Sequence, residues 1–292
     1  MSRVAQSYGY FLQILSPWLV GGKMTRFQQF IRERKYLGNI SERSVEWYNW
    51  AFKWLVNESP DDAALKDCIL RMREAGLSPR SVNGFITAVN AYLKWSGSSL
   101  NMKKMKCEQK VLSTYAHEDI QVFIRWKPKT RCQRRLQVIV LALADTGCRI
   151  SELLGLRWGD VNLDDLLVTV RGKGNKQRTI PFSLELRKHL FKLQQESKFD
   201  LVFSARDGQA LGRRNVLRDV KALCGKLKVK VPERSLHAFR HSFALHYIRK
   251  SGSPFLLQRA LGHTTLDMTK RYVNLNTQDL SEAHQRVSLL SR

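Results

Sequence analysis

Four short motifs lie in the C-terminal two thirds of this chain, and their reactive side chains suit a single reaction centre. They are far apart in the sequence, so a fold that uses them together must bring four distant segments to one place. The motifs are TGCRISELLGL (146–156), VRGKGNKQRTIP (170–181), LHAFRHSFA (236–244) and LGHTTLDMTKRYV (261–273). The side chains in question are Arg149, Lys173, His237, Arg240, His263 and Tyr272.

This set of side chains suits attack on a phosphodiester without a metal ion. Two arginines can hold the non-bridging oxygens of a phosphate. Two histidines can hydrogen-bond the phosphate or move a proton, and a lysine can protonate a leaving oxygen. A tyrosine can act as a covalent nucleophile, provided that nearby positive charge stabilises its phenolate.

Local patterns place these residues on defined elements. Arg149 follows a glycine at an expected helix start, with Glu152 on the same helix face to orient its guanidinium. Lys173 lies between two glycines at the tip of an expected hairpin. His237 and Arg240 are one helical turn apart, and the neighbouring His241 is expected to pack or support rather than react. Taken singly, each pattern also fits an ordinary ion pair, basic turn or packed side chain.

Taken together and in this order, the motifs resemble those of the tyrosine recombinase, or phage integrase, family. The resemblance covers about residues 111–292, and its most specific part is His-x-x-Arg, then Leu-Gly-His, then a tyrosine nine residues later. It implies a mainly α-helical protein with a small β-sheet: a four-helix core-binding domain that binds DNA, followed by a mixed α/β catalytic domain.

The resemblance also implies a role for each motif residue. Lys173 would be the general acid for the departing 5′ oxygen, and His237 would assist proton transfer. Arg240 would clamp the phosphate, His263 would face it, and Tyr272 would form a 3′-phosphotyrosyl bond. A 5′-hydroxyl of a partner strand would then reverse the step, so neither a cofactor nor ATP is expected.

Three functions are compatible with these motifs. The leading one is a site-specific DNA recombinase that acts as a homotetramer on two duplexes, in integration, transposition or chromosome-dimer resolution. A topoisomerase of the type IB kind would share the tyrosine chemistry. A DNA-binding regulator that has lost catalysis is the third, and the complete set of six residues argues against it.

Net charge agrees with a nucleic-acid partner. The 50 lysines and arginines exceed the 25 acidic residues, giving a formal charge of +25, and both halves of the chain are basic. Such an excess favours a polyanion over an anionic membrane. Basic side chains expected to meet DNA are Arg43, Arg80, Lys103, Lys104, Lys176 and Arg178.

Cysteine usage and the N-terminus bear on location. The five cysteines are scattered and form no CxxC pair, so neither a zinc site nor a disulfide framework is expected, and a reducing cytoplasm fits. Residues 9–20 form an apolar run that is too short for a bilayer and is interrupted by polar residues. We expect residues 1–23 to be an extra segment that contains an amphipathic helix.

Helix signals divide the remainder into domains. Residues 24–98 show four helical stretches: one over 25–36, one after Ser41, one starting at Ser59-Pro60, and one from Ser78-Pro79 to Trp95. Residues 99–112 lose this periodicity and are expected to form a basic linker.

The catalytic domain, 113–292, is predicted to start with a helix at 117–126 after Ser113 or Thr114. A buried helix through 136–143 and a strand pair at 166–171 and 176–180 follow. A last helix is expected after Thr277, docked on its own domain or on a neighbouring protomer.

Overall fold

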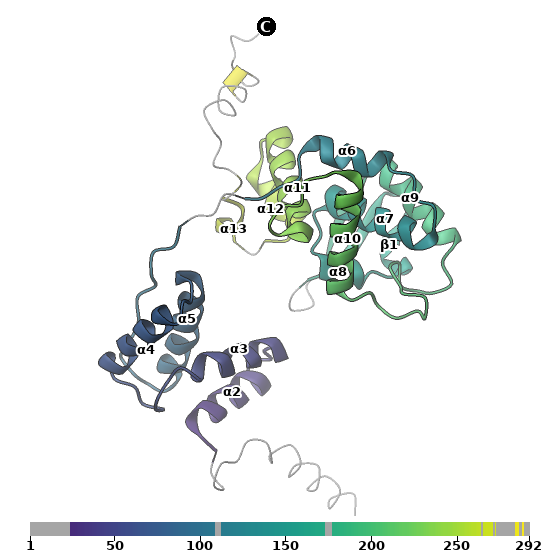
Figure 1. Ribbon diagram of the computed structural model, residues 1–292. Coiled ribbons are helices and arrows are strands. Elements are labelled where there is room, and N and C mark those ends of the chain that lie inside the picture. Colours follow the sequence, from purple (N-terminus) through teal and green to yellow (C-terminus); the bar gives the residue numbers. More distant parts are fainter. Residues whose placement is uncertain are drawn as a thin grey trace, which may run out of the picture. The chain divides into compact units, whose positions relative to one another are not determined.

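The computed structural model describes residues 24–108, 112–172, 177–263, 265–270, 272, 284–285 and 288 (Figure 1). The chain divides into two compact units, residues 1–110 and 111–292. The expected N-terminal amphipathic helix and most of the helix expected after Thr277 lie outside the described residues. No described helix combines the length and the apolar character needed to cross a membrane.

The first unit consists of four described helices, drawn in purple and blue in Figure 1. Three of them begin at serine, threonine or aspartate side chains that accept a hydrogen bond from the first helical turn, and the fourth does so at Ser78, directly before a proline. The helices are α2 (Arg26–Tyr36), α3 (Glu42–Phe52), α4 (Asp62–Glu74) and α5 (Pro79–Trp95).

One cap differs from the sequence prediction. We expected α4 to begin at Ser59-Pro60, but its cap is Asp61, whose carboxylate accepts from the backbone N–H of Ala64 at 2.7 Å. The Ser59 hydroxyl instead accepts from Arg26 at 3.4 Å. Both residue types are good caps, and an aspartate also gains from the positive end of the helix.

Aromatic rings form the centre of this unit. Phe30 is 1% exposed, and its ring makes edge contacts with four others, with centroids 5.1 to 5.9 Å apart. These rings come from α3 and α5, so α2 is held by contacts that span the unit. The partners are Tyr48, Phe52, Tyr92 and Trp95.

The segment expected to be a linker lies along α5 as far as it is described. The Asn90 side chain both donates to and accepts from the backbone of Met102, at 2.9 Å in each case. Asn83 does the same with Met105, at 2.9 and 2.8 Å. Asn83 and Asn90 are two helical turns apart, and each makes a pair of hydrogen bonds with the backbone of this segment, as a neighbouring strand would. Met102 and Met105 also pack on the aromatic core.

The second unit surrounds a central buried helix, α7 (Arg131–Thr146). Every residue from Gln137 to Leu143 is buried, because α6, α9, α10 and α11 all contact α7. The other helices are α6 (His117–Arg125), α8 (Ile150–Leu154), α9 (Leu184–Gln195), α10 (Arg213–Leu227), α11 (Ser235–Ser251), α12 (Pro254–Leu261) and α13 (Asp267–Lys270), together with a 3-10 turn, Trp158–Asp160.

Helix α6 starts at His117, as predicted. Its cap position is Ala116, and the Asp119 carboxylate accepts from the Ala116 N–H at 3.0 Å. An acidic residue in the first turn therefore caps this helix end.

A small antiparallel sheet completes the unit, with strand order β1-β2-β3. The hairpin predicted from alternating valines is present as β2 (Leu167–Arg171) and β3 (Gln177–Pro181), in the register Val170 to Arg178. Strand β1 (Val161–Asn162) was not predicted; it is only two residues long and pairs with β2. This sheet carries the motif 170–181 toward α8 and α12.

We predict that the second unit is held by its buried aromatic residues and not by exposed ones. Phe203→Ala, at a fully buried ring, should lower the free energy of unfolding by about 3–5 kcal/mol, since it leaves a cavity. Phe191→Ala, at a ring that is 48% exposed, should cost less than about 0.5 kcal/mol. Hydrogen exchange of α7 amides measures opening of this unit alone. Equal losses for both variants would contradict the packing.

Candidate active site

The first motif forms the turn between α7 and α8. Helix α7 ends at Gly147, whose φ of +61° is left-handed, and Arg149 stands directly before the first residue of α8. A Cβ at Gly147 would lie 2.4 Å from a ring carbon of Phe243 on α11. Glycine is therefore required both by the backbone and by the close approach of α11.

Glu152 holds Arg149 in place. One carboxylate oxygen accepts from Nη1 of Arg149 and the other from its backbone N–H, both at 2.9 Å. The Arg149 side chain is 35% exposed, whereas that of Glu152 is 3% exposed. The orienting contact predicted from the i,i+3 spacing is thus present, and the guanidinium is left accessible to a ligand.

Arg240 joins three motifs from a buried position on α11. Its guanidinium donates to the carbonyl of Gly147 at 2.7 Å and to the carbonyl of Leu261, at the end of α12, at 2.8 Å. Burial, with the charges of Arg149 and Arg178, lowers the pKa of Arg240 to about 10. The group is still protonated at pH 7, so a cation is fixed where the three segments meet.

His237 lies one turn before Arg240, as the spacing predicted, and is exposed. Partial desolvation, together with the charges of Arg240 and Arg149, lowers the pKa of His237. The shift favours the neutral imidazole, which suits a group that accepts a proton.

Tyr272 lies against α11 with its hydroxyl on His241. The two residues are 3% and 5% exposed, and the phenol oxygen is 2.8 Å from Nδ1 of His241. The His241 ring in turn meets the His237 ring edge-on, with centroids 4.8 Å apart. A supporting role for His241 was expected, but its contact with the phenol was not. The i,i+4 spacing of His237 and His241 was the available signal, since it puts both on one helix face.

His263 follows the last turn of α12. Gly262 ends that helix with a φ of +64°, so the chain reverses and His263 leaves the helix axis. Nδ1 of His263 is 2.9 Å from the hydroxyl of Thr269, a residue of α13. The orientation of the imidazole is therefore set by a contact with the segment that leads to Tyr272.

Arg178, at the base of the hairpin, also reaches Glu152. Its two terminal nitrogens contact the two carboxylate oxygens at 3.1 and 2.9 Å. Burial of the carboxyl raises the pKa of Glu152, but hydrogen bonds from Arg178 and Arg149 outweigh it and lower the pKa to about 2. Glu152 is therefore ionised and shared by two arginines.

Five of the six predicted catalytic residues are described, and hydrogen bonds and charge interactions place four of them in one region. Arg240 bonds to both motifs that flank it, Arg149 lies close enough to His237 to lower its pKa, and His263 stands two residues beyond a carbonyl bound by Arg240. Tyr272 joins through its influence on the pKa of Arg240. Lys173 and Lys176 lie outside the described residues.

Comparison with known proteins gives the family. A model of the phage integrase family matches residues 114–279. The tyrosine recombinase XerA of Pyrococcus furiosus is 31% identical, over 86% of this chain and 90% of that protein. XerC of Xanthomonas campestris is 29% identical, over 77% and 73%.

The chain belongs to the phage integrase family. It is a site-specific DNA recombinase of the tyrosine type.

Solved structures share the fold of this recombinase. The XerH site-specific recombinase in a post-cleavage complex with difH substrate gives a TM-score of 0.70 at 19% identity, covering 91% of this chain and 85% of that one. The Tn1549 transposon integrase with transposon right end DNA gives 0.72 at 18% identity, covering 90% and 99%. At this identity the likeness concerns the fold alone.

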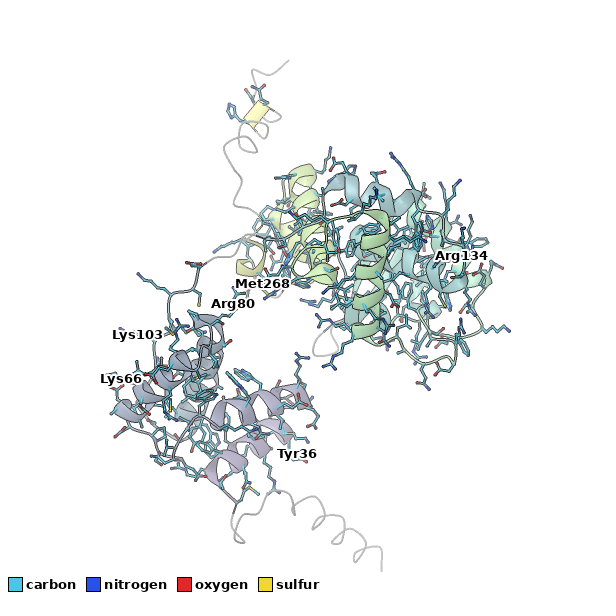
Figure 2. The ribbon with its side chains drawn as sticks, in the orientation of Figure 1. Tyr36, Lys66, Arg80, Lys103, Arg134 and Met268 are labelled. Atoms are coloured by element: carbon cyan, nitrogen blue, oxygen red, sulfur yellow. The ribbon has the colours of Figure 1, made fainter. Side chains whose placement is uncertain are left out.

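The basic residues predicted to meet DNA fall into two groups in the recombinase. Arg43, Arg80, Lys103 and Lys104 are exposed on the first unit, and Figure 2 shows Arg80 and Lys103 on its outside. The asparagine contacts to Met102 and Met105 hold the segment that presents the two lysines. Arg178 is different, because its side chain is 13% exposed and is bonded to Glu152.

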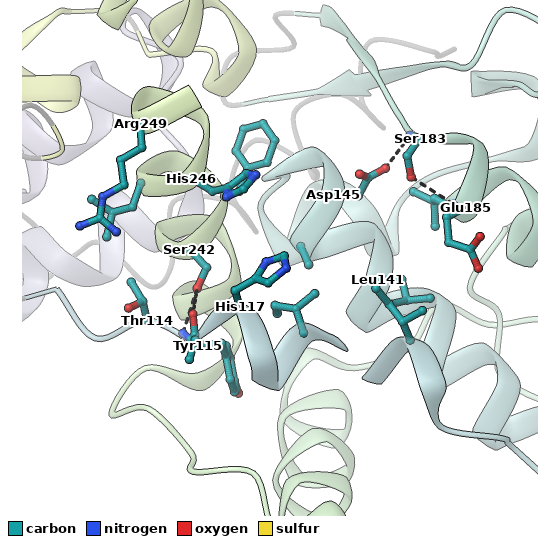
Figure 3. A pocket seen from close by; sticks show the side chains of 17 residues that line it. Thr114, Tyr115, His117, Leu141, Asp145, Ser183, Glu185, Ser242, His246 and Arg249 are labelled. Atoms are coloured by element: carbon teal, nitrogen blue, oxygen red, sulfur yellow. Dashed lines mark hydrogen bonds between the residues drawn. The ribbon is translucent and has the colours of Figure 1, made fainter. Parts of the chain in front are cut away.

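A cavity of about 440 Å³ lies in the second unit (Figure 3). It is lined by residues of α6, α7, α9 and α11, and the rings of His117 and His246 face each other within it, with centroids 6.0 Å apart. None of the five described residues that were predicted to be catalytic lines it. Within the described part of the chain, no three histidine, cysteine or acidic side chains are grouped as a metal site.

We predict that Glu152 makes the recombinase sensitive to acid. Its pKa is about 2 in the folded chain and near 4.5 when unfolded, so its contribution is complete above pH 4.5 and is lost as the pH falls toward 2. Between pH 6 and pH 3 the wild type should lose roughly 2 kcal/mol more stability than Glu152→Gln. Urea unfolding at several pH values measures this. Parallel losses in the two proteins would show that Glu152 does not titrate as described.

Proposed function

We propose that this recombinase cuts and rejoins double-stranded DNA with Tyr272 as the nucleophile. The observation that carries the proposal is the buried guanidinium of Arg240, bonded to the Gly147 and Leu261 carbonyls at 2.7 and 2.8 Å. It holds the Arg149 turn and the turn before His263 around one point. Preorganised donors of this kind stabilise charge that develops on a phosphate.

In the proposed cleavage step the Tyr272 hydroxyl gives its proton to His237 and its oxygen attacks the scissile phosphorus. The bond from phosphorus to the 5′ oxygen breaks, and Lys173 gives a proton to that oxygen. A 3′-phosphotyrosyl bond and a free 5′-hydroxyl result. In the second step a 5′-hydroxyl of a partner strand gives its proton to Lys173 and its oxygen attacks the phosphorus. The bond to the tyrosine oxygen breaks, and Tyr272 regains a proton from His237.

Side chains of the recombinase supply the charge and proton transfers for both steps. Arg149 and Arg240 bind the non-bridging oxygens, and His263 donates a hydrogen bond to the phosphate. His237, whose lowered pKa favours the neutral imidazole, assists proton transfer. Each step exchanges one phosphate ester for another, so the reaction as proposed needs no ATP. The arginines and Lys173 supply the positive charge, so the proposed steps do not require a metal ion.

Double-stranded DNA is the proposed partner of both units. Support comes from the net charge of +25 and from the exposed basic side chains of the first unit. The XerH and Tn1549 integrase structures that share the fold contain DNA. We place the protein in the cytoplasm, where all five of its cysteines would stay reduced, in keeping with the free thiols of the structure.

The proposed assembly is a homotetramer on two DNA sites. Exchange between two duplexes requires four strand cuts, and each cut consumes one tyrosine, so four copies are needed. The topoisomerase and regulator alternatives are not favoured, because the relatives described above are named recombinases.

We predict that Tyr272→Phe binds its DNA site as the wild type does but forms no covalent complex, because the ring is kept and the nucleophilic oxygen is lost. Denaturing electrophoresis on a nicked duplex that carries the site, found by sequencing DNA trapped by the wild type, measures the adduct. A denaturation-resistant complex with the variant would refute the assignment.

The same variant, bound to two unbroken sites, should have the mass of four copies.

A second prediction tests Lys173 as the general acid. Lysine is protonated at neutral pH, so Lys173→Ala should slow cleavage about 10²–10⁴-fold, the usual size of general-acid effects. A 5′-bridging sulfur leaves without a proton, so this substrate should recover most of the loss. Arg149→Ala is the control and should recover little, because it binds non-bridging oxygens. Equal defects of Lys173→Ala on both substrates would make it a binding residue.

A further inference from the structure

Arg178 was expected to contact DNA, but its position does not suit that role. It stands on β3 opposite Val170, and its side chain is 13% exposed. Arg171, on the neighbouring strand, is 58% exposed, as is usual for an arginine that meets solvent or phosphate. The positive charge of Arg178 is paired with the Glu152 carboxylate. Arg240 is buried too, but its hydrogen bonds go to two neutral carbonyls.

Three nitrogens of Arg178 are bound by protein oxygens. Nη1 and Nη2 make a bidentate pair with the Glu152 carboxylate at 3.1 and 2.9 Å. Nε donates to the carbonyl of Ala260, near the end of α12, at 3.2 Å. A lysine could not reproduce this fork, because its ammonium is a single point on a flexible stem.

Glu152 links Arg178 to Arg149, because its carboxylate accepts hydrogen bonds from both. Each carboxylate oxygen accepts two hydrogen bonds: one from Arg178 and the other from Arg149. The carboxylate is thus saturated, and its orientation is fixed from two sides. Loss of Arg178 would leave two acceptor sites unfilled in a buried position and would free Glu152 to turn, together with Arg149.

Arg178 also shapes the turn before His263. A Cβ at Gly262 would lie 2.7 Å from Cδ and 2.9 Å from Nε of Arg178, so the arginine stem packs directly on that turn. One side chain at the foot of the Lys173 hairpin therefore contacts both α8 and the end of α12.

We propose that Arg178 is a positioning residue that holds Arg149, through Glu152, and the His263 turn in the geometry that the scissile phosphate requires. This inference rests on the proposed roles of Arg149 and His263 as phosphate ligands. It replaces the direct DNA contact predicted from the sequence. A displacement of about 1 Å at such a ligand costs about 10²-fold in rate.

The test separates binding from chemistry in the full-length chain. Arg178→Lys and Arg178→Gln are titrated with a duplex of about 30 base pairs carrying the trapped site at several salt concentrations, and single-turnover cleavage is measured at saturating protein. We expect wild-type affinity and an unchanged salt slope, with cleavage slower by about 10²-fold. A phosphate contact would instead lower the slope by about 0.9 and weaken binding. That result would overturn the proposal.

Two further measurements test whether Arg178 acts on Arg149 through Glu152. The double variant Arg178→Gln, Glu152→Gln should be about as slow as the slower single variant, because both losses act on Arg149. If the double variant instead slows cleavage by the product of the two single-variant factors, Arg178 and Glu152 do not act on Arg149 together, and the proposal is contradicted. The 5′-bridging sulfur substrate should not rescue Arg178→Lys, as expected for Arg149→Ala; rescue would place the effect on Lys173 and overturn the proposal.

The controls make each failure distinguishable. Arg171→Gln removes an exposed arginine from the same sheet and should leave cleavage of bound DNA unchanged. Loss of DNA binding together with loss of cooperative unfolding in both Arg178 variants would make Arg178 a structural residue and refute the inference. If the wild type itself forms no covalent adduct, the proposed function fails. If the wild type forms the adduct and the Arg178 variants cleave normally, only the inference fails.

Discussion

A surplus of positive charge around one buried carboxylate organises the second unit. Arg240 is 2% exposed, and Arg149 and Arg178 are near enough to lower its pKa, while Glu152 supplies a negative charge among them. Three cations and one anion leave a net charge of about +2 on these four side chains. Such a cluster is unfavourable without an anion and favourable with one, which supports the proposal that it binds the scissile phosphate.

The partners of this cluster explain why four distant motifs must fold together. Arg240 uses the carbonyls of Gly147 and Leu261, and Arg178 uses that of Ala260, so helix ends supply the oxygens that stabilise the guanidinium groups. The C-terminal carbonyls of a helix are left without partners in the helix itself and carry partial negative charge. Gly147 and Gly262 end these helices with left-handed backbone, which gives the arginines access.

The proposed nucleophile is held by a different set of contacts. Tyr272 packs with Ala244, Ile248, Leu257 and Leu261, and its hydroxyl contacts His241. A phenol with a normal pKa near 10 is a weak nucleophile, so the proposed mechanism requires the positive cluster to stabilise its phenolate. The apolar cluster fixes the position of the ring, and in the proposed mechanism the arginines increase the reactivity of its oxygen.

The sequence by itself determined the family, the helix starts at Ser41 and Ser78, the β2–β3 hairpin, and the arginine and histidine spacings, because each depends on neighbours within a turn or a strand. Only the tertiary structure decided the partners of Arg178 and His241, the two-residue strand β1, and the fixing of residues 102–105 on α5. It also placed the cap of α4 at Asp61 instead of the expected Ser59. These outcomes depend on segments far apart in the chain, and local propensity carries no information about which buried group a long side chain will meet.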